Sequence, residues 1–194
     1  MTQNRAIFLD RDGVLVEDVD WLTNVAQIRI LEGAPAAARR LKEAGYLLLV
    51  VTNQPVIARG LATEAEIEMI NAAIGQRLVE AGAPPIDRFY LCPHHPRATL
   101  PAYRTDCACR KPRPGMILQG ARDFGVDLTA SFMVGDRMTD VFAGAKAGCR
   151  TVFVQTGKHL EPLIQTTEVL DPNVTPDWTC ANLAAATDWI LTRP

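Results

Sequence analysis

The sequence lacks the features of several protein classes. Its longest wholly apolar run extends from Tyr46 to Val51, whereas a membrane-crossing helix needs roughly 18 or more apolar residues. The first apolar stretch is interrupted by Asp10, Arg11 and Asp12, which excludes the apolar region of a secretory signal peptide at this place. We therefore expect a cytoplasmic protein that does not act in a membrane.

An excess of charge of one sign is also missing. The 194 residues include 20 Lys and Arg against 22 Asp and Glu, which gives a formal net charge of −2. A nucleic-acid-binding protein usually carries a basic excess, so no nucleic-acid partner is expected. The five cysteines are not expected to form a disulfide framework in a reducing compartment. Apolar residues make up 48% of the chain, which is typical of a globular protein with its own core.

Short apolar runs alternate with segments of helical periodicity along most of the chain. Strands are expected at 6–9, 47–51, 89–91, 131–134 and 151–154, and helices at 34–44, 63–78, 114–124, 141–147 and 182–191. Residues 161–176 are expected to be irregular. Apolar strands separated by helices predict an α/β fold, a Rossmann-like doubly wound parallel sheet that is covered on both faces. No shift of composition marks a boundary, so residues 1–194 are expected to form a single domain.

Polar residues follow three of the expected strands. Asp10, Thr52 and Asp136 stand at these strand ends, and ligands of parallel sheets bind beyond the carboxyl ends of the strands. Asp12 adds a second carboxylate close to Asp10, and two neighbouring anions favour a cation between them. Oxygen ligands of this kind suit Mg²⁺. A solvated turn is the alternative interpretation of an isolated D-x-D-G pattern.

Four motifs occur in a fixed order along the chain: D-x-D-G from Asp10, T-N from Thr52, K-P from Lys111 and G-D-x-x-x-D ending at Asp140. This set resembles the haloacid-dehalogenase (HAD) superfamily of phosphohydrolases over most of residues 6–158. The resemblance implies the HAD fold. The intervals between the motifs leave no room for a large cap domain, so substrate selection is expected from a short flap after D-x-D-G and from a later loop.

The resemblance also implies a role for each motif residue. Asp10 would be the nucleophile that forms an aspartyl-phosphate, and Asp12 would be the general acid and then the general base. The dehalogenases of the superfamily lack this second aspartate, so its presence favours a phosphatase. Thr52 and Lys111 would hold the phosphoryl group. Mg²⁺ would bind to Asp10, the main-chain carbonyl of Asp12, and Asp136.

A second cluster of potential ligands lies between residues 92 and 109. Cys92, His94, Cys107 and Cys109 form a possible Cys₃His site for a structural Zn²⁺, and we prefer His94 to His95 as its histidine ligand. A redox-active C-x-C pair or simply buried thiols are the alternatives.

This zinc loop leads directly into Arg110-Lys111-Pro112, which is similar to the branch of heptose-1,7-bisphosphate 7-phosphatases and histidinol-phosphate phosphatases. The long interval between the ligand pairs is more similar to the heptose enzymes. The resemblance to the heptose enzymes implies a monomeric Mg²⁺-dependent phosphatase that removes the C7 phosphate of D-glycero-D-manno-heptose 1,7-bisphosphate. Its reaction would belong to the carbohydrate metabolism that leads to lipopolysaccharide. The alternatives are a phosphatase of histidinol phosphate or another small sugar phosphate, and a catalytically inactive, zinc-stabilised binding module.

Several further residues are candidates for substrate binding. Asn53 and Gln54 follow Thr52, while Asp18 and Trp21 lie in the expected flap, where Trp21 could instead pack on the core. Cations that could receive a second phosphate are Arg110, Arg137 and Lys158.

Two positions leave questions open at this stage. Pro55-Val56 stand where the family commonly has Ser-Gly, and proline removes a backbone donor there. Asp140 would orient Lys111 or the metal shell, or else be an ordinary surface carboxylate.

Overall fold

The computed structural model describes residues 3–160 and 170–193. The strands are β1 (Arg5–Leu9), β2 (Tyr46–Asn53), β3 (Arg88–Cys92), β4 (Phe132–Gly135), β5 (Arg150–Val154) and β6 (Trp178–Cys180). The α-helices are α1 (Ala34–Glu43), α2 (Pro55–Ala58), α3 (Glu64–Glu80), α4 (Gly115–Phe124), α5 (Met138–Ala147) and α6 (Leu183–Leu191). Two 3₁₀ turns are η1 (Val25–Gln27) and η2 (Pro101–Tyr103).

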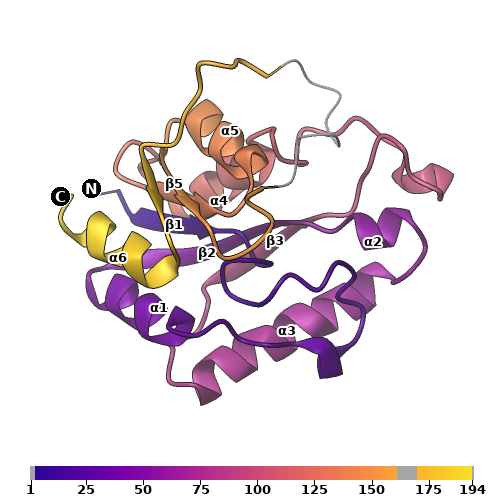
Figure 1. Cartoon of the computed structure of the whole chain (residues 1–194). Coiled ribbons are helices and arrows are strands. Elements are labelled where there is room, and N and C mark those ends of the chain that lie inside the picture. Colours follow the sequence, from indigo (N-terminus) through magenta and orange to yellow (C-terminus); the bar gives the residue numbers. More distant parts are fainter. Residues whose placement is uncertain (1–2, 161–169, 194) are drawn as a thin grey trace.

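The six strands form one parallel sheet in the order β3-β2-β1-β4-β5-β6. Helices α4 and α5 cover one face, and α1, α3 and α6 cover the other (Figure 1). The predicted doubly wound parallel sheet is confirmed. Among the described residues, no group of elements forms a large cap over it.

Strand β1 is apolar at every position from Ala6 to Leu9 because both of its faces are buried. Ile7 and Leu9 pack in the core on the side of α1, α3 and α6, whereas Ala6 and Phe8 pack on the side of α4 and α5. This alternation follows from the two-residue period of a strand. It places Asp10, the next residue, at the carboxyl edge of the sheet's centre.

Helix α3 begins with a capping box. The Thr63 hydroxyl accepts the Glu66 N–H at 3.2 Å, and the Glu66 carboxylate accepts the Thr63 N–H at 2.7 Å. Helix α6 is capped as well, since Asn182 Oδ1 accepts the Ala185 N–H at 3.0 Å. Both caps satisfy backbone donors that a helix leaves unpaired at its start.

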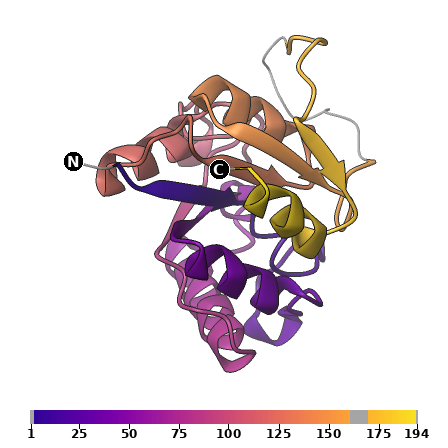
Figure 2. The same cartoon turned by 90° about the vertical axis from the view of Figure 1, so that its left-hand side faces the viewer.

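The structure contains a strand that was not expected from the sequence. Strand β6 was not predicted, because its three residues at the sheet edge are exposed or half-buried and lack an apolar run (Figure 2). Of the segment predicted to be irregular, 161–169 lies outside the described residues and 170–176 contains no helix or strand. No helix within the described ranges has the length and hydropathy to cross a bilayer.

Candidate active site

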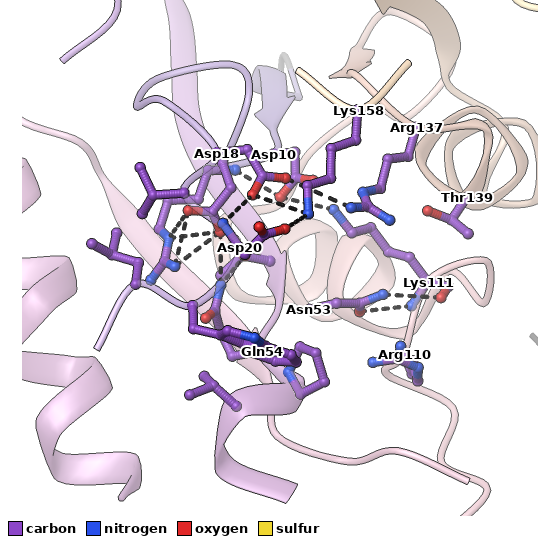
Figure 3. Close-up of a pocket in the computed structure, with 18 residues that line it drawn as sticks. Asp10, Asp18, Asp20, Asn53, Gln54, Arg110, Lys111, Arg137, Thr139 and Lys158 are labelled. Carbon is purple, nitrogen blue, oxygen red and sulfur yellow. Dashed lines mark hydrogen bonds and ion pairs between the residues drawn. The ribbon is translucent and has the colours of Figure 1, made fainter. Parts of the chain in front are cut away.

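The carboxyl ends of β1, β2 and β4 lie side by side at one edge of the sheet. Leu9 pairs with Val50 of β2 and with Val134 of β4, and the Asp10 N–H donates to Val134 O at 2.9 Å. The residues that follow these strands line a pocket with a volume of about 310 Å³. Figure 3 shows the labelled side chains converging there.

A cluster of three buried carboxylates lies at this edge. One oxygen each of Asp10, Asp136 and Asp140 lies within 4.8 Å of the others. Burial, opposed by Lys111 and reinforced by the charge of Asp140, raises the pKa of Asp10 to about 7. Burial and repulsion from Asp10 and Asp140 raise the pKa of Asp136 to about 8.

These carboxylates fit a divalent cation. Asp136 Oδ1 is buried and has no hydrogen-bond partner among the described residues, which is costly unless another group compensates for it. A hard cation with oxygen ligands would satisfy this atom and offset the repulsion between the carboxylates. The residues present therefore suit Mg²⁺.

Lys111 is the cation of the cluster. Its ammonium lies 3.0 Å from Asp10 Oδ1 and 2.6 Å from Asp140 Oδ1, and it donates to Val51 O at 2.8 Å. Burial disfavours the charged lysine, but the two carboxylates outweigh it and raise the pKa of Lys111. Asp140 also accepts the Arg137 N–H at 2.9 Å through its other oxygen. Asp140 is buried, so the interpretation as a surface carboxylate is wrong.

Asp12 stands apart from the carboxylate cluster and is connected to Thr52. The Gln54 amide donates to Asp12 Oδ2 at 3.0 Å and to the Thr52 hydroxyl at 2.8 Å. Gln54 and Thr52 are buried, which fixes the position of this link. Gln54 therefore holds together two of the residues that the sequence assigned to catalysis.

Asn53 lines the pocket, and its amide also binds the main chain of Lys111. Asn53 Nδ2 donates to Lys111 O at 3.0 Å, and Asn53 Oδ1 accepts the Lys111 N–H at 3.1 Å. Pro55 and Val56 line the pocket too. Pro55 occupies the first turn of α2, where its missing N–H leaves no helical bond unmade.

The flap and two basic residues form the rim of the pocket. Arg137 Nη2 lies 3.6 Å from Asp18 Oδ2, while the ammonium of Lys158 lies 3.6 Å from Asp18 Oδ1 and also contacts Asp20 (Figure 3). Asp20 was not singled out from the sequence, because its contact depends on a backbone φ of 62° that no local pattern signals. Thr139 lines the same pocket and was not predicted from the sequence either.

Trp21 lies at the rim and not in the core. It is 40% exposed and lines the pocket, and the guanidinium of Arg59 lies 5.1 Å from the centre of its ring. Core packing, the alternative considered for Trp21, is therefore wrong.

Two glycines form a slot for Asp136. A Cβ atom added to Gly157 would collide with Asp136 Oδ2, and one added to Gly13 would lie 2.5 Å from the same oxygen. Gly13 also has a φ of 75°, a conformation that favours glycine. The Lys158 N–H donates to Asp136 Oδ2 at 2.6 Å, so the loop after β5 contacts this carboxylate directly.

The predicted cysteine and histidine ligands come together in a second cluster. Cys109 Sγ lies 3.1 Å from Cys92 Sγ, 3.0 Å from Cys107 Sγ and 3.5 Å from His94 Nδ1. Hydrogen bonding with Cys92 and Cys107 outweighs burial and lowers the pKa of Cys109 to about 5. His95 is outside the cluster, and its Nδ1 accepts the Arg97 N–H at 3.0 Å. Three thiols and one imidazole suit a tetrahedral Zn²⁺ site.

This cluster supports the segment that enters the pocket. Arg110 directly follows Cys109, and its Nη1 donates to His94 O at 3.1 Å. Burial lowers the pKa of Arg110. Arg113 Nη1 donates to Cys107 O at 2.9 Å. The cluster and its contacts thus fix the chain on both sides of Lys111.

Comparisons with known proteins agree with this geometry. Residues 108–186 match a family model described as HAD-hydrolase-like. The chain is also similar to the crystal structure of the D,D-heptose 1,7-bisphosphate phosphatase of B. bronchiseptica in complex with magnesium and phosphate, with a TM-score of 0.81, 35% identity, and 98% and 99% of the two chains covered. The fold and the site together define a HAD-like phosphatase.

Curated relatives narrow this class. The chain is 42% identical to the D-glycero-beta-D-manno-heptose-1,7-bisphosphate 7-phosphatase of Photorhabdus laumondii, over 81% of this chain and 85% of the relative. It is 44% identical to the protein of the same name from Salmonella typhi, over 79% and 81%. The chain belongs to the D-glycero-beta-D-manno-heptose-1,7-bisphosphate 7-phosphatase family.

Proposed function

We propose that this protein hydrolyses the C7 phosphate of D-glycero-D-manno-heptose 1,7-bisphosphate. One observation carries the proposal: the nucleophile, acid–base and phosphate-binding candidates of the HAD pattern surround one pocket, in a chain of this family. Asp10 and Lys111 are 3.0 Å apart, and Asp12 is linked to Thr52 through Gln54.

Asp10 attacks the phosphorus atom, and the bond between phosphorus and the C7 oxygen breaks. Asp12 donates its proton to the leaving oxygen, which gives an aspartyl-phosphate and the sugar alcohol. Asp12 then accepts a proton from the water that attacks the phosphorus, and inorganic phosphate leaves. Lys111 and Thr52 hold the phosphoryl oxygens during both steps.

Mg²⁺ would be held by Asp10 and Asp136 together with the main-chain carbonyl of Asp12. When bound, it supplies positive charge to the transferring phosphoryl group and offsets the repulsion within the carboxylate cluster. The magnesium and phosphate in the B. bronchiseptica structure support this part of the proposal.

The rim supports a substrate with two phosphates. Arg110 and Arg137 line the pocket, and we assign them to the C1 phosphate, with Asp18 and Trp21 contacting the sugar. Histidinol phosphate carries one phosphate and would leave these cations without an anion. The product, a sugar 1-phosphate, suits a pathway that builds activated heptose for lipopolysaccharide in the cytoplasm.

We further propose that Cys92, His94, Cys107 and Cys109 hold a structural Zn²⁺. This ion would fix the loop that presents Arg110 and Lys111 to the substrate. A redox pair needs only two thiols, whereas here three thiols and an imidazole share one centre.

A panel of phosphate esters, assayed with and without Mg²⁺, tests the proposed function. We expect phosphate release from the heptose bisphosphate to exceed release from histidinol phosphate and other sugar phosphates, and to require Mg²⁺. Asp10→Asn should abolish turnover, while Asp188→Asn at an exposed position of α6 serves as the matched control. Equal rates for all esters would overturn the substrate assignment, and no turnover of any ester would favour the inactive binding module.

A further inference from the structure

Arg11 is a buried cation for which the proposed reaction has no role. It is only 1% exposed, although it stands between the two aspartates of the D-x-D-G motif. A buried guanidinium is costly unless its donors are paired. The partners of Arg11 therefore show what its burial achieves.

Two nitrogens of the Arg11 guanidinium bind the carboxylate of the neighbouring Asp12. Arg11 Nε lies 3.2 and 3.1 Å from the two oxygens of Asp12, and Nη2 lies 3.1 and 2.9 Å from them. The third nitrogen, Nη1, donates to Asn71 Oδ1 at 2.9 Å. Asn71 is buried on α3, on the face of that helix that is otherwise apolar.

The guanidinium of Arg11 fixes the orientation of the Asp12 carboxylate, which faces the pocket. The Asp12 side chain is 23% exposed and also accepts the Gln54 amide. Arginine and glutamine N–H groups are pure donors here, so Asp12 is held as an acceptor on both sides. Any proton that Asp12 delivers must then lie on the side that faces the pocket.

We propose that Arg11 and Asn71 are positioning residues for the general acid–base step: Arg11 orients the Asp12 carboxylate, and Asn71 orients Arg11. This inference rests on the proposed function and on the role of Asp12 in it. A pair that served stability alone would bury both charges away from substrate, whereas this one ends at the pocket.

Leaving groups of different basicity separate positioning from structure. A sugar alkoxide needs a proton from Asp12 as the phosphorus–oxygen bond breaks, whereas p-nitrophenolate leaves without one. In single-turnover experiments with excess enzyme, we expect Asn71→Leu and Arg11→Lys to slow cleavage of the heptose bisphosphate on the order of 10-fold more than the p-nitrophenol burst, which is part of the roughly 100- to 10,000-fold that general acid catalysis contributes. Lysine keeps the positive charge but lacks the planar set of N–H donors that a guanidinium offers.

Asn71→Asp provides the conservative rescue, because it retains an acceptor for Arg11 Nη1. Its rates with both esters should stay within roughly 3-fold of wild type, well inside the effect of losing general acid catalysis. Thr187→Val removes a buried hydroxyl on distant α6 and controls for a general loss of stability, which thermal unfolding of every variant measures.

Slowing of both esters by the same factor in the Asn71 and Arg11 variants would overturn the inference and indicate a structural role. Unchanged rates would overturn it as well. If wild type hydrolyses neither ester, the proposed function itself fails, which is a different result from either of these.

Discussion

Asp136 lies in a slot between Gly13 and Gly157, where neither glycine leaves room for a side chain. The Lys158 N–H fixes one oxygen of the carboxylate, and the other oxygen remains buried without a partner. The glycines thus leave room for the Asp136 carboxylate, and its unpartnered oxygen is available to bind a metal ion. Of these details, the sequence predicts only that Asp136 stands at a strand end, because the slot depends on how the loop after β5 folds back over Gly13.

Gly157→Ala should weaken Mg²⁺ binding on the order of 10-fold or more, the range seen when the groups around a metal ligand are altered. The added methyl group would displace Asp136 Oδ2. The Mg²⁺ concentration for half-maximal activity, together with the shift in melting temperature caused by Mg²⁺, measures the effect. Gly75→Ala on α3 is the matched control, since its Cβ would make only ordinary contacts, 3.7 Å from Phe89. An unchanged Mg²⁺ requirement in Gly157→Ala would show that Asp136 tolerates the shift.

The residue identities of the candidate site could be predicted from the sequence because the HAD motifs are local. Their connections could be predicted only in part. The contact of Asp140 with Lys111 was one of two interpretations of Asp140, and the structure contains it. The contact of Asn53 with the main chain of Lys111 was not foreseen, because it depends on the distance between loops that are far apart in the sequence.

Among the elements, the strands and the longer helices were predictable because continuous apolar runs and capping residues are strong local signals. β6 was not predictable, since Trp178, Thr179 and Cys180 are held in place by pairing with β5 and by the stacking of Trp178 on Trp189, with ring centres 5.9 Å apart. Tertiary contacts define this strand.

Thr63→Ala should lower the free energy of unfolding by about 1 kcal/mol, the usual cost of losing a helix N-cap. The capping box lies outside the pocket, so kcat and KM should not change. Chemical denaturation compared with Glu68→Ala, an exposed residue of the same helix, gives the measurement. A loss no greater than that of the control would mean that the cap contributes nothing.

The zinc loop, residues 92–109, supports Arg110, which directly follows it. Cys107→Ala should remove the one zinc expected per chain, lower the stability and raise the KM for the bisphosphate, because Arg110 loses its support. Metal analysis and kinetics measure both effects. Cys180→Ala, which removes a thiol outside the cluster, should keep the zinc. Metal-free wild-type protein with full stability would contradict the zinc proposal.

At the scale of the whole molecule, the carboxylate cluster couples stability to pH. The pKa values of Asp10 and Asp136, raised to about 7 and about 8 from an ordinary value of 3.8, mean that the folded protein binds more protons than the unfolded chain between these limits. Its stability without metal must then fall as the pH rises from about 4 to about 8.

Mg²⁺ should reverse this trend, because it replaces the protons that the cluster holds. At pH 8, Mg²⁺ at 100 times its Kd should add about 2.7 kcal/mol of stability, and the gain should shrink toward pH 5.5. Thermal unfolding with EDTA or Mg²⁺ across this range tests the expectation. A gain that is independent of pH would show that the carboxylates are ionised without the metal. Asp136→Asn should flatten the pH dependence.

The central position of β1 has a consequence for the synthesis of the protein on the ribosome. Asp10 and Asp12 are made early, but the neighbouring strand β4, with Asp136 after it, is translated more than 100 residues later. A nascent chain that has not yet released β4 holds the nucleophile without Asp136, the second carboxylate of the proposed metal site. Cellular phosphate esters therefore meet a working pocket only after most of the polypeptide has emerged.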